Sequence, residues 1–367
     1  MVVPMKGGNR PSPYEGSPVA YQELLEKPRN VHAVNVTPFR IYWPEQSTAR
    51  RREERPVDDG AERVPELQDV THCDVTVNNV RLHYVRAGEE TADPIVLLHG
   101  FPQSWMMWRL ILPTLAANHF VVAVDLRGYG DSEKPPRKAG HDQGTKASDV
   151  RALVQHLSLE RVVIIGHDRG ARVARRYALD YPEDLAGVAL LDILPAEYVY
   201  DGLTAGEAAW RYWHWVFHLV PELPEQLIIG REDAYLERFF GRTPEFLGQL
   251  HSDGAYREYR RAFLQPGAVG AALADYRDTY EVDVPRYRAE RAAGVRVTVP
   301  VALLWGDRGN LAGQPVPEIW REVATDVRDA VEIEDCGHYL PEEQPKVVAE
   351  HLLRFAGECF EAVQSRR

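Results

Sequence analysis

Residues 163–172 read Val163-Ile-Ile-Gly-His-Asp-Arg-Gly-Ala-Arg172. Three β-branched residues open the stretch, and two glycines, Gly166 and Gly170, flank Asp168 at its centre. Glycines at these places let the chain turn sharply from a strand into a helix, which leaves the central side chain exposed beside the helix N-terminus. The stretch therefore predicts a strand, a tight turn with a carboxylate at its apex, and a helix.

The acid at the apex, Asp168, decides which chemistry fits. A serine that attacked a saturated carbon would leave an ether with no easy route to hydrolysis, whereas a carboxylate leaves an alkyl ester that water can cleave. A lone Gly-x-Asp-x-Gly can also be a turn whose acid only caps a helix. Because a buried strand precedes this Gly-x-Asp-x-Gly motif and a helix follows it, we favour the interpretation of Asp168 as a nucleophile for dehalogenation or epoxide opening.

Short apolar runs on either side predict the rest of a sheet. Runs of this kind suit strands buried on both faces of a parallel sheet, and they lie at Pro94–His99, Phe120–Val124, Val162–Ile165, Val188–Leu191 and Val299–Leu304. A hairpin of Asp74–Val77 and Val80–Val85 precedes them, with Asn78-Asn79 as its turn. Helical stretches lie between and after the runs, at Trp105–Ala117, Ala147–Leu157, Ala171–Leu179 and Lys346–Phe355. This alternation predicts an α/β fold with a mostly parallel, doubly wound sheet.

The alternation of strands and helices also predicts the domain organisation. Residues 1–68 are rich in Pro, Arg, Glu and Gly without a sustained period, which indicates a poorly ordered extension. The core comprises 69–195 and 296–367, and the helical, aromatic-rich segment 196–295 forms a lid after the sixth core strand. Such a lid lies over the carboxyl edge of the sheet, where open α/β sheets bind ligands. Together with the strand-to-helix turn, this organisation is typical of the α/β-hydrolase fold.

Composition narrows the partners and the compartment. The 367-residue chain has a formal net charge of −12, which gives no electrostatic footprint for nucleic acid or an anionic membrane. Its three cysteines show no metal or disulfide spacing, and no apolar run approaches the roughly 18 residues of a membrane span. We therefore expect a cytoplasmic enzyme with a small-molecule substrate and neither cofactor nor metal, while formation of a homodimer stays open.

A base and an orienting acid are expected later in the chain. His338, in the loop Asp335-Cys-Gly-His338, follows the last predicted strand and is suited to activating water near neutral pH. The acid is either Asp192, which ends a strand just before the lid, or Asp307, which ends the strand after it. A post-lid acid usually lies three residues beyond the glycine, where this chain has Gly309, so we favour Asp192 and interpret Asp307 as a turn residue.

Two backbone N–H groups are expected to form an oxyanion hole. His99-Gly100-Phe101-Pro102 follows a buried strand, and in this fold such a loop supplies one donor, while the residue after the nucleophile supplies the other. The donors would belong to Phe101 and Arg169. They would stabilise the tetrahedral intermediate that forms when water attacks the ester on Asp168.

Two arginines and three lid residues suggest what is bound. Arg169 and Arg172 stand at i and i+3 at the start of a helix, where they form either surface salt bridges or a clamp for a substrate carboxylate. His214, Trp215 and Tyr276 can each donate a hydrogen bond, and converging donors would stabilise a departing halide. The same tyrosine could instead protonate an epoxide oxygen.

The sequence resembles the haloacetate dehalogenases, including those active on fluoroacetate, from about residue 70 to the C-terminus. The matching stretches are HGFPQS, DLRGYGDSEKP, GHDRGAR, LLDILP, YWHW, DYR and GHYLPEE. The resemblance implies nucleophile, acid and base at Asp168, Asp192 and His338, carboxylate ligands at Arg169 and Arg172, and halide ligands at His214, Trp215 and Tyr276. HGFP and GYGDS are shared with epoxide hydrolases. The extension, the lid before Trp210, and Arg211 in place of a common lysine depart from the pattern.

Three functions follow as hypotheses. The first is hydrolytic dehalogenation of a short 2-haloacid such as chloro- or fluoroacetate, which gives a 2-hydroxy acid and halide. The second is epoxide hydrolysis with the same nucleophile and base. The third is a binding protein that keeps the pocket without hydrolysis, and the intact set of Asp168, Asp192 and His338 argues against it.

Overall fold

A computed structural model of the chain describes residues 67 and 69–365, and within them it contains one eight-stranded sheet. The strand order is β1-β2-β4-β3-β5-β6-β7-β8, and β2 alone runs against the other strands. The strands are β1 (Thr71–Val77), β2 (Val80–Ala87), β3 (Pro94–Leu98), β4 (Phe120–Val124), β5 (Val162–His167), β6 (Leu185–Leu191), β7 (Val301–Gly306) and β8 (Val327–Ile333). The predicted mostly parallel α/β sheet is confirmed.

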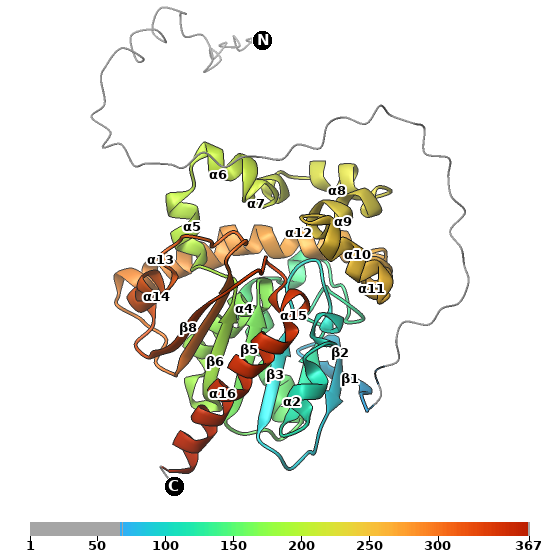
Figure 1. The fold of residues 1–367 in the computed structure, drawn as a ribbon. Helices are drawn as coiled ribbons and strands as arrows, with labels where there is room; N and C mark the ends of the chain where they lie inside the picture. The colour runs from blue at the N-terminus through green and yellow to red at the C-terminus, as the bar shows by residue number, and fades with distance from the viewer. Residues whose placement is uncertain (1–66, 68, 366–367) are drawn as a thin grey trace, which may run out of the picture. The chain divides into compact units, whose positions relative to one another are not determined.

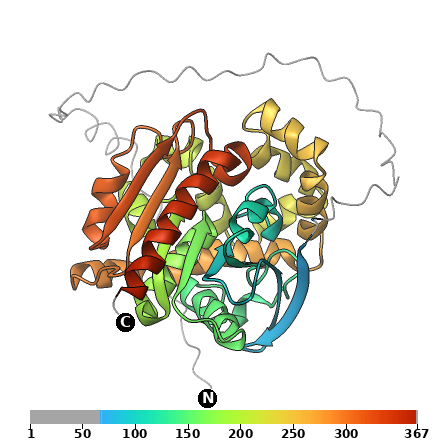
Figure 2. The same cartoon turned by 60° about the horizontal axis from the view of Figure 1, so that its bottom comes forward.

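Helices cover both faces of the sheet, which is why β4, β5, β6 and β7 are buried along their whole length. Figures 1 and 2 show α2 and α16 on one face and α4 on the other. The helices of the core are α2 (Leu112–Ala116), α3 (Gln143–His156), α4 (Arg169–Asp180), α14 (Val316–Val323), α15 (Leu340–Glu343) and α16 (Pro345–Gln364), with short 3₁₀ turns η1 (Trp105–Trp108), η2 (Arg137–Ala139) and η3 (Pro182–Asp184).

A helical insertion separates β6 from β7, after the sixth strand as the sequence predicted. Its elements are α5 (Ala196–Gly202), α6 (Ala205–Trp210), α7 (Trp213–Leu219), α8 (Leu223–Ile228), α9 (Glu232–Phe240), α10 (Pro244–Ser252), α11 (Ala255–Phe263), α12 (Ala268–Asp278), the π-helical turn η4 (Thr279–Asp283) and α13 (Val284–Ala292). They lie across one end of the sheet (Figure 1). We call this insertion the lid.

Buried charges join the lid to the core. Arg109, which follows η1, forms ion pairs with Glu342 in α15 and with Asp253 at the end of α10. The hydroxyl of Tyr259 in α11 donates to the same Glu342 carboxylate at 2.7 Å. Because separating a buried ion pair leaves charges without partners, this cluster holds the lid against the core.

One local prediction was wrong, and two elements were not predicted. The single helix expected over Trp105–Ala117 is instead η1 and α2, because Pro113 lacks the N–H that a continuous helix needs and starts a new helix. The strand β8 and the preceding α14 were not predicted. Strand β8 lies at the edge of the sheet, and Arg328, Asp329 and Glu332 interrupt the apolar run that marks a fully buried strand.

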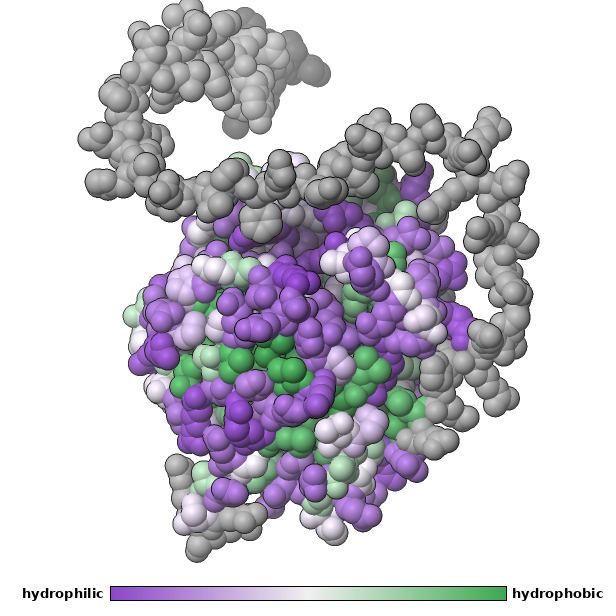
Figure 3. Space-filling model, in the orientation of Figure 1, coloured by the Kyte–Doolittle hydropathy of each residue, from purple (hydrophilic) through white to green (hydrophobic). Residues whose placement is uncertain are grey.

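On the face of the molecule seen in Figure 3, the described residues are mostly hydrophilic, with hydrophobic areas between the polar ones. Among the described residues, no helix has the length and apolar character to cross a membrane. Cys73, Cys336 and Cys359 are all free thiols. The extension predicted over residues 1–68 lies outside the described residues, except for Leu67.

Candidate active site

The turn between β5 and α4 brings Asp168 to the carboxyl end of the sheet. Asp168 has a φ of +46°, a conformation that side chains rarely adopt and that marks a strained turn. Both flanking glycines are required: a Cβ on Gly170 would stand 2.1 Å from the carbonyl oxygen of Leu98, and one on Gly166 would stand 2.6 Å from the backbone of Ala171. The close packing of strand against helix therefore fixes where the carboxylate lies.

His338 lies between two carboxylates. Its Nδ1 is 2.5 Å from Oδ2 of Asp192, and its Nε2 is 3.9 Å from Oδ2 of Asp168. The second distance is too long for a direct hydrogen bond. The other candidate acid, Asp307, instead accepts a hydrogen bond from the backbone N–H of Cys336 at 3.0 Å, as a turn residue does.

Gly309, at the position where a post-lid acid usually lies, is close to the carboxylate of Asp192. A Cβ built on Gly309 would be 3.3 Å from Oδ1 of Asp192. The two chain positions at which this fold can carry the acid therefore converge on one point next to His338.

The backbone N–H of Phe101 donates to Oδ1 of Asp168 at 3.0 Å. The backbone N–H of Arg169, the second donor expected, has no acceptor among the described residues. It stands at the first position of α4, where helix N–H groups have no partner within the helix. Oδ1 is thus held by one donor, while Oδ2 faces His338.

His167, which the sequence analysis did not single out, supports the base. Burial, and then the charge of His338, lowers its pKa to about 3, so the ring is neutral. Its Nε2 lies 2.7 Å from the carbonyl oxygen of His338, which makes it a donor to that carbonyl. The histidine before Asp168 therefore fixes the backbone of the loop that carries His338, a role that no sequence signal indicated.

The electrostatics keep Asp168 ionised. Burial alone raises the pKa of this carboxyl, but His338 first, and then His167, Arg169 and Arg172, more than offset it, so the pKa lies below its ordinary value. A buried carboxylate that stays ionised without a direct ion pair to either arginine is available as a nucleophile.

The predicted role of the Arg169 side chain needs correction. Its Nε donates to Oδ2 of Asp275 at 3.1 Å, and its Nη2 donates to the backbone oxygen of Asp275 at 3.0 Å, to Oδ1 of Asp275 and to Thr279. Lys146 approaches the same carboxylate at 2.7 Å. The Arg169 guanidinium is not among the groups that line the cavity in front of Asp168, and these lid residues occupy its Nε and Nη2.

Arg172, by contrast, opens onto the cavity together with Asp168. It is 4% exposed, donates once to the carbonyl of Leu194 at 3.2 Å, and stacks over the ring of Trp215 at 4.8 Å. Its buried Nε has no partner, and it forms no ion pair with any carboxylate among the described residues. Burial and the nearby charge of Arg169 lower its pKa. A buried cation with free donors is a site for an anion.

Of the three predicted lid donors, two line the cavity and one does not. His214 and Trp215 line the cavity, and the buried Nδ1 of His214 has no partner. Burial, and then His218, lowers the pKa of His214 far below its ordinary value, so its ring is neutral. Tyr276 does not line the cavity. Its ring centroid lies 5.7 Å from that of His214, and its hydroxyl has no hydrogen-bond partner among the described residues.

The cavity is small. Its volume is about 30 Å³, which is room for roughly two or three water molecules at about 10–15 Å³ each. Tyr212, Arg242 and Asn310 also line it and were not predicted: Arg242 and Asn310 stand outside every motif quoted above, and Tyr212 belongs to the YWHW stretch but was given no role. A cavity of this size suits a substrate of a few heavy atoms.

One cluster outside this site has the composition of a metal site. Ligand atoms of His83, Asp125 and Asp131 lie within 4.8 Å of one another. However, His83 Nδ1 is 2.7 Å from Asp125, whose carboxylate also accepts the backbone N–H groups of Trp105 and Asp131. These hydrogen bonds explain the cluster as a structural support for the loop after β4.

Comparison with known proteins extends this description. Residues 93–345 match the family described as the alpha/beta hydrolase fold. A soluble epoxide hydrolase of Corynebacterium sp. (strain C12) is 35% identical over 294 residues, 78% of this chain and 97% of that protein. A fluoroacetate dehalogenase of Burkholderia sp. is 35% identical over 244 residues, 64% of this chain and 77% of that protein. The crystal structure of Cfl2 from Burkholderia cenocepacia, 38% identical, matches with a TM-score of 0.71 over 79% of this chain and 97% of that one. The chain is therefore a hydrolase and belongs to the α/β-hydrolase family.

Proposed function

We propose that this hydrolase is a dehalogenase of short 2-haloacids such as chloro- or fluoroacetate, acting through an ester on Asp168. One observation carries the proposal: Arg172, a buried guanidinium without a carboxylate partner among the described residues, shares a cavity of about 30 Å³ with Asp168. A substrate carboxylate on Arg172 would satisfy that charge and hold the α-carbon in front of Asp168.

In the first step Oδ2 of Asp168 attacks the α-carbon, because Oδ1 is occupied by the N–H of Phe101. The new C–O bond forms as the carbon–halogen bond breaks, and the halide departs with the bonding electron pair. N–H groups of His214 and Trp215 stabilise the halide as its charge develops. The product of this step is an alkyl ester of the Asp168 side chain.

In the second step His338 removes a proton from water, and the resulting hydroxide attacks the carboxyl carbon of the ester. Asp192, at 2.5 Å, stabilises the imidazolium. The tetrahedral oxyanion is held by the N–H groups of Phe101 and Arg169. Collapse breaks the bond between the carboxyl carbon and the alkoxide oxygen, and His338 returns the proton to give the 2-hydroxy acid.

A second candidate is epoxide hydrolysis with the same nucleophile and base. It is supported by the epoxide hydrolase relative at the same 35% identity as the dehalogenase, and by the unpartnered hydroxyl of Tyr276, which would have to turn into the cavity to protonate an epoxide oxygen. Burial, and then the charge of Asp168, raises the pKa of Tyr276, so this hydroxyl keeps its proton. The buried Arg172 favours the haloacid, because a neutral epoxide leaves that charge unsatisfied.

A halide-release screen over fluoro-, chloro- and bromoacetate, with styrene oxide as the neutral comparison, tests the proposal. We expect halide release from at least one haloacetate, with the Asp168→Ala variant inactive as the matched control. Styrene oxide turnover without any halide release would replace the proposal by the second candidate.

Trapping the ester tests the mechanism itself. In a His338→Ala variant the first step needs no base, so bromoacetate should leave a carboxymethyl group on the peptide that contains Asp168. Mass spectrometry that finds no adduct there, while wild-type enzyme releases halide, would contradict covalent catalysis by this residue.

A further inference from the structure

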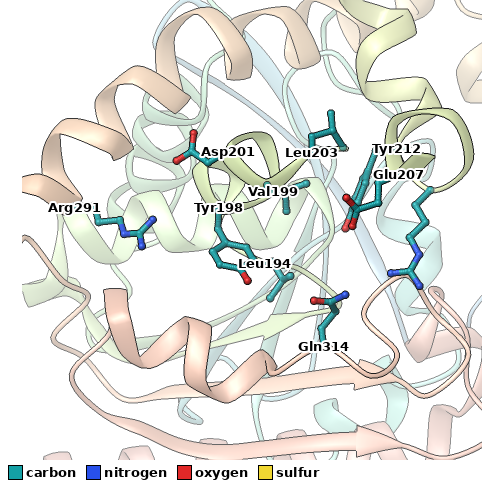
Figure 4. A pocket seen from close by; sticks show the side chains of 11 residues that line it. Leu194, Tyr198, Val199, Asp201, Leu203, Glu207, Tyr212, Arg291 and Gln314 are labelled. Atoms are coloured by element: carbon teal, nitrogen blue, oxygen red, sulfur yellow. The ribbon is translucent and has the colours of Figure 1, made fainter. Parts of the chain in front are cut away.

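A second hollow lies beside the catalytic cavity. We call it the outer pocket; it is lined in part by Tyr198, Leu203, Glu207, Arg291 and Gln314. Figure 4 shows Glu207 and Tyr212 on one side of it and Arg291 on the other, with Leu194 and Tyr198 between them. The volume of the outer pocket is about 340 Å³, and that of the catalytic cavity is about 30 Å³. The steps proposed above do not use it.

The two hollows share a wall made of side chains. Leu194, Val199 and Tyr212 line both the outer pocket and the catalytic cavity. Next to this wall Arg211, which lines the outer pocket, donates to the carbonyl of Asn310, which lines the cavity, at 3.3 Å. These side chains therefore separate a molecule in the outer pocket from the catalytic cavity.

Tyr212 is the member of this wall that can move most cheaply. It is 9% exposed, and its hydroxyl has no hydrogen-bond partner among the described residues. Its ring packs on Trp215, with centroids 4.9 Å apart. Leu194 and Val199 have smaller side chains, so rotation of either one opens less of the wall than rotation of the Tyr212 ring. Rotation of the Tyr212 ring sacrifices packing but no hydrogen bond to a described residue.

Opening the whole lid is the costlier alternative. It would separate Arg169 from Asp275, a buried ion pair between the core and the lid, and Arg109 from Asp253, a partly buried one. Separating a buried ion pair leaves charges without their partners. A small substrate needs far less movement than that, so a side-chain gate suffices.

We propose that the outer pocket is the substrate entrance of the catalytic cavity, and that Tyr212 is the gate between them. The proposal rests on the proposed function, since it describes how a haloacid reaches Asp168. The gate also limits which substrates are accepted. A 2-haloacid with a longer side chain can reach Asp168 only if Tyr212 leaves room for its tail to remain in the outer pocket. The competing route passes Arg242, an exposed residue that also lines the cavity.

A reversible plug tests the entrance. Gln314 lines the outer pocket but not the cavity, so Gln314→Cys followed by benzyl methanethiosulfonate fills the entrance through a disulfide that a reductant removes. We expect kcat/KM for bromoacetate to fall at least tenfold on labelling and to recover on reduction. Glu350→Cys, on the exposed face of α16, and labelled wild type, which has the half-buried Cys73, are the matched controls.

The outcomes separate the two proposals. Halide release from Gln314→Cys that is unchanged by labelling overturns the entrance alone, and so does a loss confined to labelled Arg242→Cys. An unlabelled enzyme that releases no halide overturns the proposed function, and the entrance as a path for haloacids with it.

Tyr212 is tested by substrate size. We expect Tyr212→Ala to raise the ratio of kcat/KM for 2-bromohexanoate to that for bromoacetate at least tenfold. Tyr212→Phe, which keeps the ring, should retain the wild-type ratio. An Ala variant that slows both substrates equally would identify Tyr212 as a packing residue and overturn its role as a gate.

Discussion

Arg172 and Arg175 lie one turn apart on α4, each 4% exposed, yet substituting them should have opposite consequences. Arg172 has no carboxylate partner among the described residues, whereas Arg175 forms two hydrogen bonds with the buried Glu197, at 2.7 and 2.8 Å. We consider the change of each arginine to methionine, which keeps much of the side-chain volume and removes the charge. If Arg172 is a ligand for substrate, its removal harms activity; if Arg175 is a structural ion pair, its removal harms stability.

The expected magnitudes follow from the contacts. Arg172→Met loses a charged hydrogen bond to the Leu194 carbonyl, worth about 1.5–3 kcal/mol, and a cation–π contact with Trp215 worth up to about 2 kcal/mol. It also removes the burial of an unpaired charge, a penalty of several kcal/mol. We expect the free energy of unfolding to change by less than about 1 kcal/mol. Arg175→Met leaves Glu197 buried without its partner and should lower that free energy by about 3–5 kcal/mol.

For catalysis we expect the larger effect from Arg172→Met. Loss of a buried charge pair with the substrate carboxylate costs about 2–5 kcal/mol, so Arg172→Met should lower kcat/KM for chloroacetate by roughly 30- to 5,000-fold. Turnover of a neutral epoxide should stay within about threefold, because no carboxylate is bound. Urea unfolding and halide release measure the two quantities on the same preparations. If Arg172→Met unfolds as easily as Arg175→Met, or keeps its haloacid activity, Arg172 is not a free ligand.

Three further predictions concern other residues. Asp192→Asn should lower kcat by about 10²–10⁴-fold while the ester on Asp168 accumulates, which mass spectrometry of quenched enzyme detects; a slow variant without accumulated ester would contradict this role. Burial raises the pKa of Asp283 to about 7 from 3.8, so the folded state loses stability as pH rises through that window, and the penalty is complete above it. Asp283→Asn, whose side-chain oxygen can still accept from Gln143 N–H, should therefore raise the free energy of unfolding by up to about 4 kcal/mol at pH 8 and leave it unchanged near pH 3; equal unfolding curves at pH 8 would refute the raised pKa. Arg211→Gln should lower kcat/KM for bromoacetate a few-fold at low ionic strength and leave kcat unchanged, and the difference should vanish in about 0.5 M salt; a loss that persists in salt would mean that its charge does not guide the substrate.

The sequence predicted the elements whose signal is local. The strand and helix around Asp168 depend on two glycines and an apolar run, and all of these lie within ten residues of one another. The edge strand β8 was missed because half of its side chains face away from the core, so charges are tolerated where the pattern demands apolar residues. Periodicity detects burial on both faces better than burial on one.

The residues of the candidate site show the same difference between local signals, which the sequence reveals, and long-range contacts, which it does not. Asp192 and His338 were predicted from their places at strand ends, and the structure brings them within 2.5 Å. The Arg169 side chain was assigned to the substrate, but its partner Asp275 stands more than a hundred residues later, in the lid. Only the fold reveals that this side chain pairs with a carboxylate of the lid. Arg242 reaches the cavity for the same long-range reason, from a part of the lid without any motif.

The convergence of Gly309 and Asp192 on one point beside His338 bears on how such enzymes diversify. An ancestor could gain a carboxylate at the second place before losing it at the first, since both would serve the same imidazole. The position of the carboxylate in the site is then conserved, while the residue that carries it changes from one before the lid insertion to one after it. Relatives that differ in which aspartate they carry need not differ in descent or in reaction.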